Sequence, residues 1–318
     1  MLLKEFKNHF SQQLATIYPK NEVDSFFFLL IEKELDLQRI DLALNNKLSI
    51  SEEKFKHLSN ALSRLKSQEP IQYILGETTF FDLHLNLSKD TLIPRPETEE
   101  LVEWIINDYK NSLLAERSRS QQLNENMSIL DIGTGSGCIP ISLKKNIVKA
   151  SVSAIDVSEN ALAIAIENAT INDVDINYIQ QDILTAESLD FIANKIKQSQ
   201  NINEVTSSKT PQNDIKFDII VSNPPYVREL EKEEINPNVL DNEPHIALFV
   251  KNNDPLLFYK KIADLAKSHL KPNGLLYFEI NQYLGKETVS MLSEKGFTTE
   301  LRKDLFGNDR MIKSTIIK

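Results

Sequence analysis

Residues 128–138 read Ser-Ile-Leu-Asp-Ile-Gly-Thr-Gly-Ser-Gly-Cys, a short apolar segment followed by three alternating glycines. The pattern predicts a strand over Ile129–Ile132 and a helix that begins after Gly137. Glycines let the backbone come close to a ligand, and the beginning of a helix presents unpaired N–H groups. A dinucleotide-binding loop has the spacing G-x-G-x-x-G, but here Cys138 takes the third position. The stretch therefore favours a nucleoside cofactor over a nicotinamide dinucleotide, with a merely tight turn as the alternative.

Two carboxylates follow the next predicted strands. Asp156 comes directly after Ser151–Ile155, and Asp182 follows Asn177–Gln180. A carboxylate at the end of the second strand can accept hydrogen bonds from both hydroxyls of an adenosine ribose. We therefore predict that Asp156 binds a ribose and that Asp182 lies near an adenine. A helix-capping Asp156 and an ordinary turn carboxylate at Asp182 are the alternatives.

Residues 217–226 read Phe-Asp-Ile-Ile-Val-Ser-Asn-Pro-Pro-Tyr, so an apolar strand runs into a turn stiffened by two prolines. Open α/β sheets bind ligands at this end of their strands. If the Asn223 side-chain oxygen and the Pro224 carbonyl each accept one N–H, a planar nitrogen is held with its lone pair facing an electrophile. Tyr226 can stack on the planar group, and fixing this geometry lowers the barrier. The turn thus predicts transfer of an electrophilic group to the nitrogen of an amide or aromatic amine, with Asn223, Pro224 and Tyr226 as catalytic residues.

Strand candidates alternate with helices from residue 128 onward, which predicts an α/β fold with a parallel sheet covered on both faces. The candidates are Ile129–Ile132, Ser151–Ile155, Asn177–Gln180, Phe217–Val221 and Leu275–Ile280. Phe297–Leu301 and Met311–Lys318 predict an antiparallel pair at one edge of the sheet. The polar residues 195–216 predict a mobile surface insertion.

The chain is predicted to have three parts. Residues 1–70 contain no glycine and show helical spacing of apolar residues, including a helix that begins near Ser49 or Ser51 and stops before Pro70. They predict a small helical bundle domain. Residues 71–96 predict a β-hairpin linker, and residues 97–318 form the predicted catalytic domain, which begins with a helix whose buried face includes Trp104.

Composition narrows the classes of function. The chain has 318 residues, and 36 Lys+Arg against 46 Asp+Glu give a net charge of −10. Residues 1–70 have equal numbers of basic and acidic side chains, so the acidic excess lies in residues 71–318, and direct binding of nucleic acid is not expected.

No apolar run approaches the ~20 residues of a membrane span, and a cytoplasmic protein is the default. The scattered histidines predict no metal site. Cys138, the single cysteine, is predicted to be a packed side chain rather than a reactive thiol.

At these residues the chain resembles the class I S-adenosylmethionine-dependent methyltransferases, and more narrowly the peptide chain release factor N5-glutamine methyltransferases. The segments that carry the resemblance are the glycine loop 133–137, residues 222–226, Pro-Ile-Gln-Tyr-Ile-Leu-Gly at 70–76, Leu-Ile-Pro-Arg-Pro-Glu-Thr-Glu at 92–99 and Asn-Glu-Pro at 242–244. The resemblance implies a Rossmann-like class I methyltransferase sheet with an antiparallel C-terminal edge, plus the N-terminal helical bundle domain. One departure is Asn281, where the family often has glycine, which puts the local backbone path in question.

The resemblance also implies roles for individual residues. The cofactor S-adenosyl-L-methionine would be bound by Gly133, Thr134, Gly135, Ser136, Gly137, Asp156, Asp182, Ile183 and Asn223. The target glutamine would be bound by Asn223, Pro224, Pro225 and Tyr226. That glutamine would belong to the Gly-Gly-Gln motif of a release factor, and residues 1–70 would help to bind the factor.

The leading hypothesis is therefore methyl transfer to a release-factor glutamine. Within the methyltransferases, the alternatives are a glutamine of a ribosomal protein or an amino group of a nucleic-acid base. Outside them, the alternatives are a nicotinamide oxidoreductase and a non-catalytic binding protein with the same fold.

Overall fold

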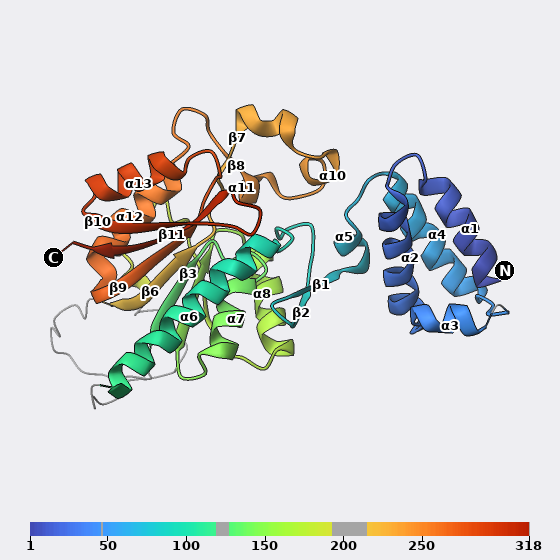
Figure 1. Cartoon of the computed structure of the whole chain (residues 1–318), viewed down its shortest axis with the longest axis horizontal. Helices are drawn as coiled ribbons and strands as arrows, with labels where there is room; N and C mark the ends of the chain where they lie inside the picture. Colours follow the sequence, from blue (N-terminus) through green and yellow to red (C-terminus); the bar gives the residue numbers. More distant parts are fainter. Residues whose placement is uncertain (46, 119–126, 193–214, 318) are drawn as a thin grey trace. The chain divides into compact units, whose positions relative to one another are not determined.

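The computed structural model describes residues 1–45, 47–118, 127–192 and 215–317 (Figure 1). Contacts divide the chain into two units, one of Met1–Thr78 with Ile235–Asn242 and one of Thr79–Glu234 with Glu243–Lys318. The three-part division into residues 1–70, 71–96 and 97–318 stays a prediction. The predicted insertion at 195–216 lies outside the described residues, apart from its last two.

The first unit is helical, as predicted. Its helices are α1 (Leu3–Leu14), α2 (Lys20–Leu35), α3 (Arg39–Leu44), α4 (Glu52–Lys66), α5 (Ile71–Leu75) and α10 (Pro237–Leu240). Phe6 and Phe10 of α1 pack against Phe27 of α2, with ring centroids 5.6–6.5 Å apart. Ser51 caps α4 by accepting a hydrogen bond from the Lys54 N–H, so the helix begins at the second of the two predicted positions, Ser49 and Ser51.

The second unit contains a seven-stranded sheet in the order β10-β11-β9-β6-β3-β4-β5. The strands are β3 (Ser128–Ile132), β4 (Ser151–Asp156), β5 (Asn177–Gln180), β6 (Phe217–Ser222), β9 (Leu270–Glu279), β10 (Phe297–Lys303) and β11 (Asp309–Ile316). β3, β4, β5, β6 and β9 are parallel, and β11 and β10 continue the sheet antiparallel. The predicted parallel sheet with an antiparallel C-terminal edge is thus confirmed.

The predicted strand at Leu275–Ile280 begins five residues earlier than its sequence pattern indicates, at Leu270. Lys271-Pro272-Asn273-Gly274 has the composition of a turn, and Asn273 has a φ of 68°. In the structure this segment interrupts the register between β6 and β9 as an irregularity of the strand, and pairing resumes at Leu275.

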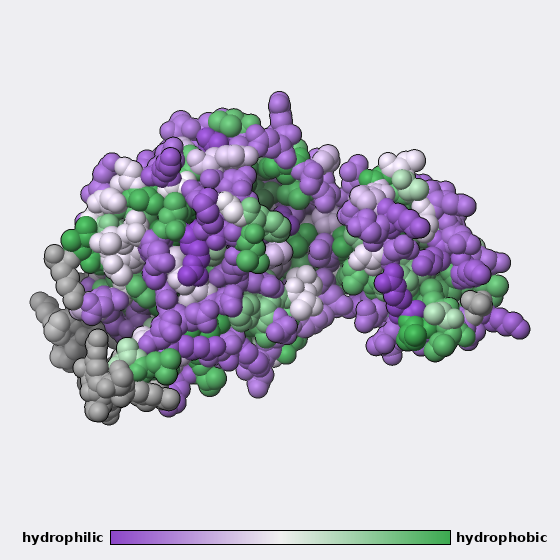
Figure 2. All heavy atoms as spheres, in the orientation of Figure 1, coloured by the Kyte–Doolittle hydropathy of each residue, from purple (hydrophilic) through white to green (hydrophobic). Residues whose placement is uncertain are grey.

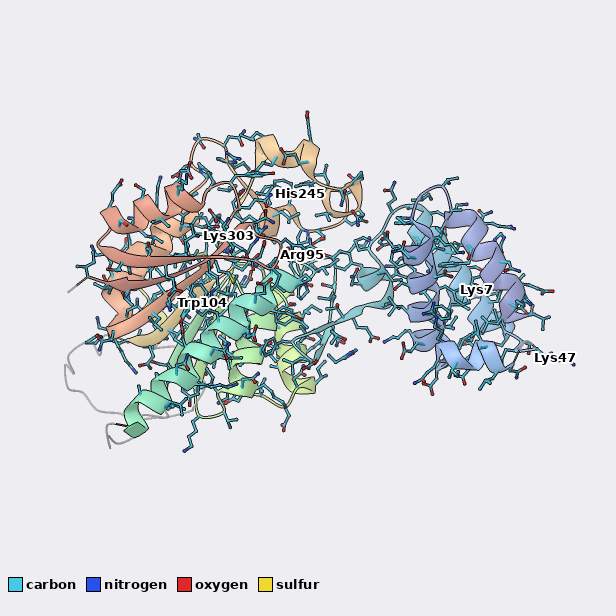
Figure 3. The ribbon with its side chains drawn as sticks, viewed as in Figure 1. Lys7, Lys47, Arg95, Trp104, His245 and Lys303 are labelled. Carbon is cyan, nitrogen blue, oxygen red and sulfur yellow. The ribbon has the colours of Figure 1, made fainter. Side chains whose placement is uncertain are left out.

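Helices cover both faces of the sheet (Figure 1). These helices are α6 (Pro96–Ser118), α7 (Cys138–Asn146), α8 (Glu159–Ile171), α12 (Leu257–His269) and α13 (Gly285–Glu294). α6 and α7 contribute to one core cluster, and α12 and α13 contribute to another. Trp104, labelled in Figure 3, is buried on α6 and meets the Tyr277 ring edge-on at 5.7 Å, so the prediction of a core tryptophan is confirmed.

The remaining elements are short. They are the paired strands β1 (Glu77–Phe80) and β2 (Leu83–Asn86), the paired strands β7 (Val227–Arg228) and β8 (Phe249–Val250), the 3₁₀ helix η1 (Glu229–Glu234) and α11 (His245–Leu248). Hydrophilic side chains dominate the face seen in Figure 2. None of the helices in the described ranges is both long enough and apolar enough to span a bilayer.

Candidate active site

A cavity of about 250 Å³ opens where β3, β4, β5 and β6 end. Parallel strands bring their carboxyl ends to one edge, so segments far apart in the sequence meet there. Of the residues that the sequence singles out, the cavity wall includes Gly133, Gly135, Asp156, Asp182, Ile183, Asn223, Pro224 and Pro225. Thr134, Ser136, Gly137 and Tyr226 lie outside this wall.

The glycine loop between β3 and α7 is shaped by positive φ angles of 79° at Gly133, 54° at Gly135 and 82° at Gly137. Gly133 and Gly135 border the cavity with bare backbone. A Cβ on Gly137 would lie only 3.0 Å from Ile141 Cδ1 and 3.1 Å from Ala165 Cβ. The first two glycines therefore leave room at the cavity, whereas the third allows α7 to pack closely.

Asp156 is held by backbone N–H groups at the end of β4. Its Oδ2 accepts a hydrogen bond from Gly135 N (2.8 Å), and its Oδ1 accepts one from Ser158 N (2.9 Å). Burial raises the pKa of this carboxyl above its ordinary value. Each carboxylate oxygen keeps a second lone pair. Asp156 can therefore accept two further hydrogen bonds from a ligand in the cavity.

The segment after β5 gives the cavity an apolar wall. Asp182 stabilises the turn by accepting a hydrogen bond from Leu184 N at 2.9 Å. The buried side chain of Ile183 lines the cavity together with Phe258 and Ile262 of α12. Such a wall suits the face of a planar, weakly polar ring.

The Asn-Pro-Pro-Tyr turn presents two acceptors. Asn223 Nδ2 donates a hydrogen bond to Thr98 Oγ1 at 3.3 Å, which fixes the orientation of the carboxamide. Among the described residues, none donates a hydrogen bond to Asn223 Oδ1 or to the Pro224 carbonyl. Both oxygens are thus left to bind a donor from outside the chain.

Tyr226 ends the turn with its hydroxyl directed into the protein. The hydroxyl donates a hydrogen bond to Glu279 Oε1 at 3.1 Å. Burial, together with the negative charge of Glu279, raises the pKa of Tyr226 above its ordinary value. The phenol is therefore neutral, and its ring has a fixed position beside the turn.

The segment 92–99 has structural contacts that residue spacing does not reveal. Arg95, labelled in Figure 3 just before α6, pairs with buried Glu243 at 2.6 Å. Glu243 also accepts a hydrogen bond from Ile93 N, and Glu99 accepts one from Phe81 N. The ion pair therefore joins two segments that the sequence identifies only through a family resemblance.

Asn281 occupies the position where the family often has glycine. It is absent from the residues with positive φ, so its backbone does not need glycine. The buried amide donates hydrogen bonds to the Tyr226 carbonyl (2.9 Å) and to Glu231 Oε2 (2.9 Å), and its Oδ1 accepts one from Tyr283 N (2.9 Å). Asn281 therefore stabilises the end of the Asn-Pro-Pro-Tyr turn by hydrogen bonding to Tyr226.

We expect Asn281→Ala to lower the free energy of unfolding by about 1–3 kcal/mol, because buried polar partners lose their hydrogen bonds. Urea unfolding measures this change. Asn252→Ala is the control, since Asn252 is exposed and, within the described part of the chain, its side chain accepts one hydrogen bond, from Leu230 N. Equal stability of the two variants would show that the Asn281 contacts contribute nothing.

Asp131 is a candidate that residue patterns did not identify as functional. It lies at the end of β3, its side chain is fully buried, and neither carboxylate oxygen has a hydrogen-bond partner among the described residues. Burial raises the pKa of Asp131 to about 7, and the negative charge of Asp156 adds to the shift. Asp131 does not line the cavity, so its carboxylate would act on a positively charged ligand there through its charge rather than by contact.

This pKa predicts an unusual dependence of stability on pH. Between the unfolded pKa of about 4 and the folded pKa of about 7, the unfolded state binds fewer protons at Asp131. The ligand-free protein should therefore lose about 1.4 kcal/mol per pH unit at this group as pH rises, with a plateau above pH 7. Urea unfolding of the wild type and of Asp131→Asn is measured from pH 4.5 to 8, and the difference between their free energies of unfolding isolates the effect of Asp131. If the free energies of unfolding of the two proteins changed equally with pH, the raised pKa of Asp131 would be contradicted.

Cys138 is a packed residue, as predicted. It is buried at the beginning of α7, and burial raises the pKa of its thiol to about 12. In the part of the chain that the structure describes, no three His, Cys, Asp or Glu side chains are grouped so that they could hold a metal ion.

The chain is similar to known proteins. Residues 5–76 match the family model for the PrmC N-terminal domain, and residues 108–195 match the methyltransferase small domain. The chain is 51% identical over 315 residues to the release factor glutamine methyltransferase of Flavobacterium psychrophilum, covering 98% of this chain and 99% of that protein. It is 39% identical over 302 residues to the release factor glutamine methyltransferase of Bacteroides thetaiotaomicron, covering 95% of each.

Among solved structures, the chain is also similar to the ribosomal protein L11 methylase of Lactobacillus delbrueckii subsp. bulgaricus. The similarity has a TM-score of 0.44 at 18% identity, and it covers 74% of this chain and 86% of that one.

Proposed function

Since the chain belongs to the release factor glutamine methyltransferase family, we propose that it transfers a methyl group from S-adenosyl-L-methionine to the side-chain amide nitrogen (N5) of a glutamine. The glutamine is the one in the Gly-Gly-Gln motif of a peptide chain release factor. The observation that carries the proposal is the pair of oxygens of two residues that line the cavity, Asn223 Oδ1 and the Pro224 carbonyl, which accept no hydrogen bond from any residue that the structure describes.

The cavity suits the proposed cofactor. Asp156 has lone pairs left for the two ribose hydroxyls, and the wall of Ile183, Phe258 and Ile262 suits the adenine. Gly133 and Gly135 leave space for the methionine part, whose ammonium and sulfonium charges are complementary to the buried carboxylate of Asp131. The bound cofactor supplies an electrophilic methyl group on a positively charged sulfur.

The turn orients the acceptor. Asn223 Oδ1 and the Pro224 carbonyl each accept one N–H of the target carboxamide, so its nitrogen faces the methyl carbon. A carbon–nitrogen bond forms as the carbon–sulfur bond breaks, and the two acceptors stabilise the positive charge that develops on the nitrogen. The nitrogen then loses one proton to water, so the reaction requires no general base.

The acceptor is a protein in this proposal. The helical unit contributes to binding the release factor, and the net charge of −10 disfavours a polyanion. A glutamine of a ribosomal protein and an amino group of a nucleic-acid base are the competing acceptors.

Mass spectrometry of a methylated substrate tests the proposal. The purified full chain is incubated with the cofactor and an unmodified release factor, and the digest is searched for one methyl on the Gly-Gly-Gln peptide. We expect complete modification of that peptide alone. Preferential methylation of ribosomal protein, DNA or RNA in a parallel reaction would overturn the choice of acceptor.

A further inference from the structure

One buried carboxylate connects both ends of the Asn-Pro-Pro-Tyr turn. Glu279, the last residue of β9, is 1% exposed. Its Oε1 accepts the hydroxyl of Tyr226 at 3.1 Å, and its Oε2 accepts the hydroxyl of Thr98 at 2.6 Å. Thr98 Oγ1 in turn accepts a hydrogen bond from Asn223 Nδ2 at 3.3 Å. The first residue of the turn thus reaches Glu279 through Thr98, and the last residue reaches it directly.

The direction of these hydrogen bonds follows from the chemistry of the groups. In its ionised form, Glu279 only accepts hydrogen bonds, and the single hydrogen of the Thr98 hydroxyl is then directed at Glu279 Oε2. The lone pairs of Thr98 Oγ1 are then left to accept, and the group of Asn223 that can donate to them is its NH₂. This arrangement excludes the flipped carboxamide, in which Asn223 Oδ1 would face Thr98 without a hydrogen between them.

Burying the carboxylate of Glu279 costs free energy, because the charged group loses its contact with water. Burial raises the pKa of Glu279, while hydrogen bonds from Thr98 and Tyr226 and the charge of Arg310 favour its ionised form. A buried charge persists only when it is paired or hydrogen-bonded. The two hydrogen bonds that described residues donate to its side chain come from Thr98, which contacts the turn, and from Tyr226, which belongs to it.

We propose that Thr98 and Glu279 are positioning residues that orient the Asn223 carboxamide, so that its oxygen rather than its NH₂ faces the methyl acceptor. Neither residue lines the cavity, and both act through Asn223. The proposal rests on the proposed function, since it concerns the acceptor site of that reaction. A flipped carboxamide would place the NH₂ of Asn223 against the N–H of the target glutamine, so two donors would face each other and no hydrogen bond would form.

Thr98→Val tests the inference, because valine keeps the shape of threonine and removes the hydroxyl. We expect kcat for release-factor methylation to fall about 10–100-fold, since misplacing a positioning group costs rates of this size. The Kd for the cofactor, measured by calorimetry, should stay within about threefold, because Thr98 does not line the cavity. Thr98→Ser restores the hydroxyl and should recover most of kcat.

Thr288→Val is the matched control. Thr288 is a fully buried threonine on α13 whose hydroxyl donates to the Leu284 carbonyl. Its replacement should cost similar stability without changing kcat. Wild-type kcat in Thr98→Val, or equal losses in Thr98→Val and Thr288→Val, would overturn the positioning role. An inactive wild type would instead refute the proposed function.

Glu279→Gln provides a second, independent test. A glutamine can donate to Thr98, whose hydrogen would then face Asn223 and favour the flipped carboxamide. We expect a loss of kcat at least as large as in Thr98→Val. Because the two residues form one chain of hydrogen bonds, the double variant should be no slower than Glu279→Gln alone. Multiplicative losses would show that the residues act separately and would contradict the inference.

Discussion

Replacing Asn223 with alanine is expected to slow methyl transfer to a release factor by about 10²–10³-fold, while the Kd for the cofactor changes by only a few-fold. The substitution removes one of two acceptors that stabilise charge developing on the target nitrogen, and the loss of one such preorganised group has an effect of this size. The Pro224 carbonyl and the rest of the cavity wall remain in place. Single-turnover rates and calorimetry measure the two quantities separately.

The control for this substitution is Asn177→Ala. Asn177 is also half-buried, and its amide donates one hydrogen bond, to the Val152 carbonyl in the sheet. It does not border the cavity, so its replacement should leave both quantities unchanged. Methylation at the wild-type rate in Asn223→Ala would show that the carboxamide has no part in holding the acceptor.

Asp156→Ala is expected to weaken cofactor binding by about 10²–10⁴-fold. The carboxylate would accept two ribose hydroxyls, and each hydrogen bond to a charged group contributes about 1.5–3 kcal/mol. The change also removes the acceptor of the Gly135 N–H, which helps to shape the glycine loop. Calorimetric titration with the cofactor and with its demethylated product should show the same loss, because both have the same ribose.

Asp218→Ala is the matched control for Asp156→Ala. Asp218 lies near the beginning of β6, at the opposite end of that strand from the cavity, and accepts a hydrogen bond from Ser128 N at 2.7 Å. Its replacement should lower stability without changing cofactor affinity. A Kd within about threefold of the wild type in Asp156→Ala would remove Asp156 from the cofactor site.

The strands and the glycine loop could be predicted because their signals are local. Buried parallel strands are short apolar runs, and positive φ angles at Gly133 and Gly135 require the residue that the sequence supplies. The meeting of Gly135, Asp156 and Asn223 could also be foreseen, because parallel strands bring their carboxyl ends to one edge. Topology alone therefore gives the approximate site.

The remaining features depend on contacts between distant residues. Thr98 and Glu279 are 181 positions apart, and neither sits in a local pattern that marks it as a partner of Asn223. Asn281, in place of the family's glycine, left the local backbone path open, and its hydrogen bonds to Tyr226 and Glu231 could not be foreseen from the sequence. The raised pKa of Asp131 follows from burial in the folded chain, which no neighbouring residue reveals.

A crystal structure of the full chain with the demethylated cofactor and a Gly-Gly-Gln peptide tests the central claim most directly. We expect the target carboxamide nitrogen within hydrogen-bond distance of both Asn223 Oδ1 and the Pro224 carbonyl, with its lone pair directed at the cofactor sulfur. A complex in which those two oxygens bond inside the protein, or in which the turn points away from the sulfur, would contradict the claim.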